Sequence, residues 1–102
     1  MSRKLRFSGW ALGQLEGALE PFDDRAAARR VARTIEQRLR NLKRTPRTGR
    51  KVPELDMDTL REVIVPPFRI VYRIERTEIR VLAVVHVRRD LGGALPPPRS
   101  RK

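Results

Sequence analysis

Five basic side chains in the C-terminal third of the chain have the types and the spacing for binding phosphate or carboxylate groups. They stand within two runs of alternating apolar and polar residues, and they are Arg69, Arg73, Arg80, His86 and Arg88. A guanidinium group donates paired hydrogen bonds to a phosphate or a carboxylate, and a histidine gains or loses a proton near neutral pH. The sequence therefore predicts an anion-binding surface and leaves open whether that surface only binds or also catalyses.

Metal and nucleophilic chemistry have little support in the sequence. The chain has no cysteine and one histidine, which excludes disulfides and thiolate zinc sites. No serine stands in a nucleophile motif, and no cluster of carboxylates suggests a metal site. We therefore expect no metal and no cofactor. The lack of cysteine fits the reducing cytosol, and no apolar run is long enough for a signal segment or a membrane span. We expect a cytoplasmic protein.

Arginine dominates the charge of the chain. Lys and Arg number 24 against 12 Asp and Glu, a formal net charge of +12, and 20 of the 24 cations are arginine. Such a surplus points to nucleic acid, a nucleoprotein machine or an acidic protein as the partner. Few aromatic side chains are present for base stacking, which argues against recognition of single strands.

Three consecutive strands must position the five basic residues. The alternation predicts strands over Leu60–Val65, Phe68–Glu75 and Glu78–Arg88. A tight turn at residues 75–78 would place Arg73 across from Arg80 and Arg69 across from Val84. One face of the sheet would then be apolar, and the other would carry all five basic side chains. Because like charges so close together repel, an acidic group should cover them.

Glu62, in the first of these strands, bears on what the surface can bind. With the Pro66-Pro67 pair at the turn, Glu62 faces Val71 and has Arg69 and Arg73 as diagonal neighbours. An ion pair with either arginine would compete with an incoming phosphate. Such a pair weakens an RNA-cleaving site and is harmless in a protein-binding surface.

Two helices precede these strands. A short strand over Lys4 to Phe7 leads to a helix that Ser8 caps and that runs to about Glu20, and a longer helix follows to about Arg44. The predicted fold class is α+β, in the order β-α-α-β-β-β, with a helical hairpin packed on one face of a mainly antiparallel four-stranded sheet. Residues 1–91 would form a single domain, and residues 92–102 a flexible, basic tail rich in glycine and proline.

That order of elements, together with particular residues, resembles the RelE/ParE superfamily of toxins from type II toxin–antitoxin systems. The resemblance extends from Lys4 to Leu91, and the ParE-like branch fits better. The residues that carry the resemblance are Ala11, Leu15, Leu42, Pro46, Gly49-Arg50, Arg61-Glu62, Phe68 to Arg73, His86 and Arg88-Arg89-Asp90.

The two branches of the superfamily act differently. RelE-like members cleave mRNA in the ribosome, and the resemblance then implies catalytic roles for Arg69, His86 and Arg88. The lysine positions of RelE fall near Leu60 and Glu62, however, and no tyrosine follows in the tail. Only the phosphate-binding half of a ribonuclease site would be present.

We therefore expect a ParE-like toxin that is not an enzyme, that inhibits growth by binding DNA gyrase and that an acidic antitoxin neutralises, as in plasmid stabilisation. The alternatives are a RelE-like, ribosome-dependent mRNA interferase (an endoribonuclease) and a basic nucleic-acid-binding module. The residues expected to bind the target are Arg61, Arg69, Arg73, His86, Arg88 and Arg89.

Overall fold

The computed structural model describes residues 3–88, so Arg89 and the predicted tail over residues 92–102 lie outside the described part. The order of elements confirms the predicted β-α-α-β-β-β fold. The elements are β1 (Lys4–Phe7), α1 (Gly9–Leu19), α2 (Arg25–Asn41), a 3-10 turn (Pro46–Thr48), β2 (Arg50–Lys51), β3 (Leu60–Val65), β4 (Phe68–Ile74) and β5 (Glu78–His86). None of the helices within residues 3–88 is both long and apolar enough to cross a bilayer.

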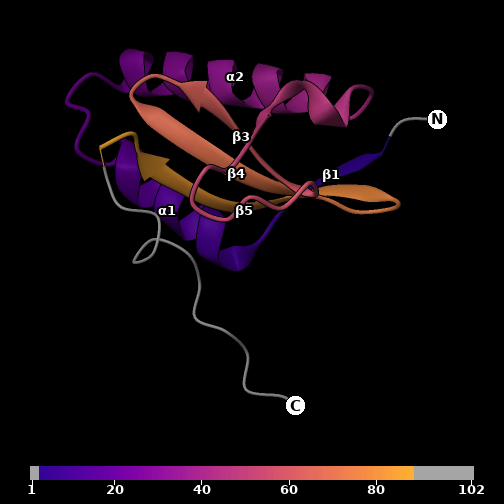
Figure 1. The fold of residues 1–102 in the computed structure, drawn as a ribbon. Helices are drawn as coiled ribbons and strands as arrows, with labels where there is room; N and C mark the ends of the chain where they lie inside the picture. The colour runs from indigo at the N-terminus through magenta and orange to yellow at the C-terminus, as the bar shows by residue number, and fades with distance from the viewer. Residues whose placement is uncertain (1–2, 89–102) are drawn as a thin grey trace.

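The sheet has five strands in the order β1-β5-β4-β3-β2, where the sequence predicted four (Figure 1). β1 runs parallel to β5, and the other neighbours are antiparallel. The additional strand is β2, in which Arg50 pairs with Glu62 and Lys51 with Arg61. Two residues are too few to show a period-two pattern, so this strand exists only through its pairing with β3.

Both helices cover the same face of the sheet. Ser8 accepts a hydrogen bond from the Ala11 N–H at the start of α1, and Asp24 caps α2 through the Ala26 N–H. In Figure 1, α2 lies nearest β3 and α1 nearest β5. The side chains buried between the helices and the sheet include Ala11, Ile35, Leu39, Leu42, Val63, Val65, Phe68, Ile70, Tyr72, Ile79, Val81 and Val84. This layer is the main hydrophobic core.

The other face of the sheet has a smaller core of its own. Residues 52–59, here called the strap, join β2 to β3 and cross in front of β4 and β5 (Figure 1). The strap holds its shape through hydrogen bonds from the Leu55 and Asp56 N–H groups to the Val52 carbonyl, and Asp56 has a φ of 49°. The buried residues of this second core are Val52, Leu60, Val71, Ala83 and Val85. The face that the sequence predicted to carry the basic side chains therefore also contains a small apolar core.

A β-bulge changes which side chains share a face. Tyr72 pairs with Val81 but Val71 pairs with Ala83, so Leu82 is an extra residue in β5. Beyond a bulge the alternation of side chains is inverted. Arg73 lies across from Arg80 as predicted, whereas Arg69 lies across from Val85 and not from Val84.

The bulge moves His86 to the helix-covered side of the sheet. His86 pairs with Phe68, whose side chain packs in the main core. The prediction that His86 shares a face with Arg69, Arg73 and Arg80 is therefore wrong. A single unpaired residue in β5 is enough to reverse its side, because strand side chains alternate with a period of two.

Among the glycines within residues 3–88, Gly49 is the one whose lack of a side chain the fold requires. Its N–H donates to the Tyr72 hydroxyl at 3.0 Å, and that hydroxyl donates to the Pro46 carbonyl at 2.6 Å. A methyl group on Gly49 would meet both the Tyr72 hydroxyl and, at 2.6 Å, the Glu62 carbonyl oxygen. Burial raises the pKa of the Tyr72 phenol, so the hydroxyl stays protonated and can donate.

We predict opposite effects for two glycine-to-alanine substitutions. Gly49→Ala should destabilise the fold by about 1–3 kcal/mol, because the new methyl group has no space. Gly13→Ala is the matched control: nothing lies within 4 Å of its added carbon, so it should stabilise α1 by about 1 kcal/mol. Urea unfolding of both variants checks this, and an unchanged midpoint for Gly49→Ala would contradict the close approach.

Candidate functional site

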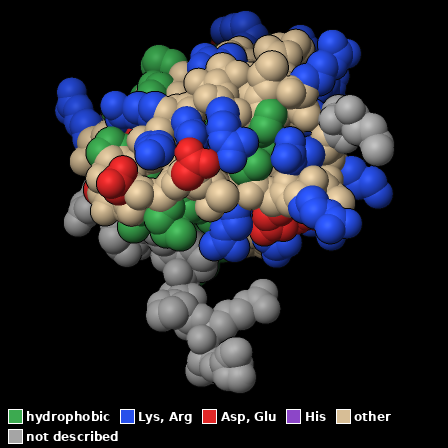
Figure 2. Space-filling view, turned by 45° about the vertical axis from the view of Figure 1, so that its right-hand side comes forward, with side chains coloured by type: hydrophobic (Ala, Val, Ile, Leu, Met, Phe, Trp, Pro, Cys, Tyr) green, Lys and Arg blue, Asp and Glu red, His purple; other side chains and the backbone are tan. Residues whose placement is uncertain are grey.

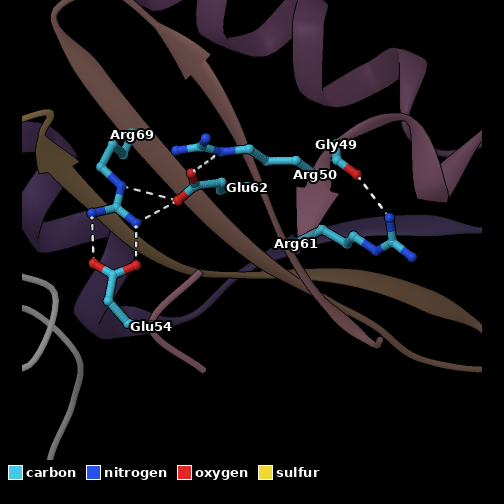
Figure 3. Close-up of polar contacts among 6 residues, drawn as sticks. All are labelled: Gly49, Arg50, Glu54, Arg61, Glu62 and Arg69. Carbon is cyan, nitrogen blue, oxygen red and sulfur yellow. Dashed lines mark hydrogen bonds and ion pairs between the residues drawn. The ribbon is translucent and has the colours of Figure 1, made fainter. Parts of the chain in front are cut away.

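A buried arginine and two carboxylates connect the strap to the sheet. Arg69 lies on β4 and is 7% exposed, Glu62 lies on β3 and is 1% exposed, and Glu54 belongs to the strap. The Arg69 Nε and Nη2 donate to Glu62 Oε1 at 2.9 and 2.5 Å. The Nη1 and Nη2 atoms donate to the two Glu54 oxygens, each at 3.0 Å. Figure 3 shows the guanidinium group held between the two acids.

Glu62 is the most buried ionisable group of this network. Its second oxygen accepts a hydrogen bond from Arg50 Nε at 2.5 Å, so the carboxylate lies between two arginines (Figure 3). A carboxylate removed from water is costly unless charged hydrogen bonds replace its hydration. Arg69 and Arg50 supply those bonds, and no buried side-chain polar atom within residues 3–88 lacks a partner.

The electrostatics of the network favour the charged forms of Glu54 and Arg69. The hydrogen bond from Arg69 lowers the pKa of the Glu54 carboxyl below its ordinary value. Reciprocally, the bonds to Glu54 and then Glu62 raise the pKa of the Arg69 guanidinium, against the opposing effect of burial. The ion pair between Arg69 and Glu54 is therefore present at neutral pH.

Arg69 is already bound on the side where an anion would approach. A guanidinium group has five N–H donors, and four of them donate to carboxylates here. A phosphate could therefore make a paired, two-bond contact with Arg69 only by displacing Glu54 or Glu62. Of the two arginines that the sequence left open as partners of Glu62, the structure shows Arg69. Glu54 was missed because it lies in a loop without any periodic pattern.

Arg61 fastens the other end of the strap. It is opposite Tyr72 on the helix-covered side of β3, and its side chain is 13% exposed. It donates to the Asp58 carbonyl at 2.9 Å, to Asp58 Oδ1 at 2.7 Å and to the Gly49 carbonyl at 3.1 Å. Hydrogen bonds from Arg47 and then Arg61 lower the pKa of the Asp58 carboxyl. The positive charge of Arg61 is therefore paired with the Asp58 carboxylate.

The ion pairs of Arg73 and Arg80 are longer than those of Arg61 and Arg69. Arg73 lies 3.8 Å from Glu75, and Arg80 lies 3.4 Å from Glu78. Arg6 of β1 pairs with Arg80 in the parallel register, so it stands beside them on the same face. Sequence reasoning missed Arg6, because the pairing of β1 with β5 is a contact between distant segments. Figure 2 shows how strongly Lys and Arg side chains outnumber carboxylates on the face in view.

His86 and Arg88 are exposed at the end of β5. The His86 Nδ1 accepts a hydrogen bond from the Arg88 N–H at 3.2 Å, so the histidine helps to shape the turn that follows the strand. Arg69 and His86 lie on opposite faces of the sheet and do not form one site. Within the described residues, no group of three or more His, Asp or Glu side chains is placed to hold a metal ion.

The chain is a small α+β protein, with a mixed five-stranded sheet, a helical hairpin on one face and the ion-paired Arg69 on the other. The chain belongs to the ParE toxin family of type II toxin–antitoxin systems, the parDE type, whose family model matches residues 5–91. This finding confirms the resemblance and the ParE-like branch. No curated protein sequence matches the chain significantly.

Solved structures of related toxins share the fold. The chromosomal ParDE system of P. aeruginosa matches with a TM-score of 0.68 and 18% identity, over 84% of this chain and 97% of that chain. E. coli RelE, a mutant in the free state, matches with a TM-score of 0.65 and 17% identity over 86% of each chain. The RelBE2 toxin–antitoxin complex of Mycobacterium tuberculosis gives 0.60 and 21%, over 84% and 99%.

We predict that acid weakens the strap through Glu54. Since the folded-state pKa of Glu54 is depressed, its contribution to stability is present above the ordinary value of 4.5 and is lost as pH falls through the lower folded value. Glu54→Gln should lower the free energy of unfolding at neutral pH. The variant should also lose less of that free energy than the original chain as the pH falls from neutral to acidic. Glu16→Gln, at an exposed position on α1, is the control, and urea unfolding over a pH series is the measurement.

A double-mutant cycle measures the buried pair. Arg69→Met should cost about 3 kcal/mol or more, because it leaves the buried Glu62 carboxylate with Arg50 alone. Adding Glu62→Leu removes the unpaired charge and should recover much of that loss. The measurement is the free energy of unfolding in denaturant. If the double variant loses the sum of what the two single variants lose, the two side chains do not depend on each other.

Proposed function

We propose that this chain is a toxin that stops growth by binding DNA gyrase, without enzymatic activity of its own. The observation that carries the proposal is the match of residues 5–91 to the ParE toxin family, because ParE-like members of the superfamily poison gyrase. The same family assignment supports an antitoxin as the neutralising partner.

The state of Arg69 supports a binding function over RNA cleavage. RNA cleavage would need a group that holds the phosphate and a base or acid beside it. Here Glu54 and Glu62 occupy the Arg69 guanidinium, and His86 lies on the other side of the sheet. The catalytic set implied by the RelE resemblance (Arg69, His86 and Arg88) therefore lacks a free, assembled centre.

The predicted target-binding residues divide into two groups. Arg61 and Arg69 are held by carboxylates and carbonyl groups that fasten the strap. His86 and Arg88 are exposed at the end of β5, so we propose that these two contact the target. Arg73 is also exposed, but it lies on the opposite face and at the other end of the sheet. Binding needs accessible donors, and the exposed arginines have them.

We propose that the antitoxin covers the outer side of the helical hairpin with an acidic segment. Trp10 and Leu12 on α1 are 44% and 46% exposed, which offers apolar surface to a partner. Arg29, Arg33 and Arg44 are exposed on the α2 side and would attract acidic side chains. The matched mycobacterial structure is a toxin–antitoxin complex, which fits a partner of this kind.

We predict that the purified chain inhibits gyrase supercoiling and that Arg88→Glu weakens this inhibition by about tenfold or more, because reversed charge repels a surface that fits arginine. Arg29→Glu makes the same charge change on α2, away from the proposed target surface, and should act like the original chain. Supercoiling assays over a concentration series measure the effect.

Controlled expression without antitoxin decides between the two kinds of toxin. Growth arrest with gyrase-dependent DNA cleavage supports the proposal. Growth arrest with ribosome-dependent cuts in mRNA, abolished by Arg69→Ala or Arg88→Ala, would show a RelE-like interferase instead. Unaffected growth with soluble protein present rules out both activities under the conditions used.

A further inference from the structure

Three arginines that are distant in the sequence form a row across the sheet. Arg6 pairs with Arg80 between β1 and β5, and Arg80 pairs with Arg73 between β5 and β4. Their strand neighbours, such as Phe7, Val81 and Tyr72, pack against the main core under the helices. Because side chains alternate along a strand, the three arginines all point to the opposite face. We call this set the arginine row.

The row has more positive charge than its neighbours neutralise. The side chains of Arg6, Arg80 and Arg73 are 60%, 34% and 49% exposed. Glu78 serves two of them, at 3.4 Å from Arg6 and 3.4 Å from Arg80, and Glu75 reaches only 3.8 Å from Arg73. Arg69, by contrast, has four hydrogen bonds to two carboxylates. The row therefore keeps unused donors that a further anion can fill.

We propose that the arginine row binds the phosphodiester backbone of duplex DNA. Neighbouring strands are about 4.8 Å apart, so the row runs across the strands and suits a polymer that crosses the sheet. An extended acidic peptide would instead add along the free edge of β1, where it would pass Arg6 and miss Arg73. Duplex DNA presents about one charge per 1.7 Å of its axis, so a row of cations about 4.8 Å apart would lie close to several phosphates at once.

The surroundings of the row favour a duplex over a single strand. Proteins that hold single strands stack the bases on exposed aromatic side chains. Phe68 and Tyr72 are buried, and Trp10 lies on α1, on the helix-covered side of the sheet. The row is left with charged neighbours, Lys4, Glu75 and Glu78. Such a surface binds backbone phosphates and does not read bases.

This inference goes beyond the proposed binding of gyrase, because the chain would then bind DNA directly. Gyrase works on DNA, so a toxin that contacts both would bind the enzyme–DNA complex more tightly than the free enzyme. DNA binding by the purified chain can be measured without gyrase. Failure of one proposal is therefore distinguishable from failure of the other.

The test compares two triple variants of the full chain with the same net charge. Arg6→Gln/Arg73→Gln/Arg80→Gln removes the row, and Arg29→Gln/Arg33→Gln/Arg44→Gln removes three exposed arginines of the α2 side. Both lower the net charge from +12 to +9. Binding of a short fluorescent DNA duplex is followed by anisotropy as salt rises from about 50 to about 200 mM.

Each phosphate contact adds about 0.9 to the salt slope of the binding constant. Loss of the row should therefore reduce the slope by roughly 2.7, so that over this fourfold salt range the original chain loses about 40-fold more affinity than the row variant. The α2 variant should keep the original slope. Thermal melting confirms folding, and Arg80→Gln alone should reduce the slope by about 0.9.

Two results would overturn the proposal. Equal reductions in slope for the two triple variants would mean that diffuse charge, and not the row, attracts DNA. An unchanged slope in the row variant, with weakened binding of a polyglutamate peptide, would assign the row to an acidic protein partner.

Discussion

The burial of the Glu62 carboxylate is the constraint on which the arrangement of the site depends. A charge that is 1% exposed requires charged donors on both of its oxygens, and Arg69 and Arg50 supply them. Arg69 in turn has donors left over, which Glu54 accepts. Because Glu54 belongs to the strap, this chain of pairs fixes the strap over the sheet and encloses the second core.

The same constraint divides the positive charge of the molecule into two kinds. Arg61 and Arg69 have their charge satisfied by the strap and therefore support the structure. Arg6, Arg73 and Arg80 stand at the end of the sheet where Glu75 and Glu78 offset them only in part. On this face of the sheet, the arginines whose charge remains available to a partner are therefore Arg6, Arg73 and Arg80, and not Arg69, which is paired with the strap.

The strand pattern shows where sequence reasoning holds and where it fails. Leu60–Val65 was predicted with its observed bounds, and the pairing of Arg73 with Arg80 is confirmed, because the hairpin turn sets that register locally. The error begins at Leu82, where the bulge inverts the alternation and moves His86 to the other face. A bulge leaves no periodic signal, since whether a strand carries an extra residue depends on how its neighbour pairs.

The sequence by itself determined the fold class, the two helices with the Ser8 cap and the family, because hydrophobic period, capping residues and turn residues act over a few positions. It also indicated that Glu62 would pair with a strand arginine. Only the tertiary structure decided that Glu54 closes the strap on Arg69, that β2 forms and that Arg6 joins Arg80 and Arg73. Those contacts join segments far apart in the chain, and they follow from three-dimensional packing that no local pattern records.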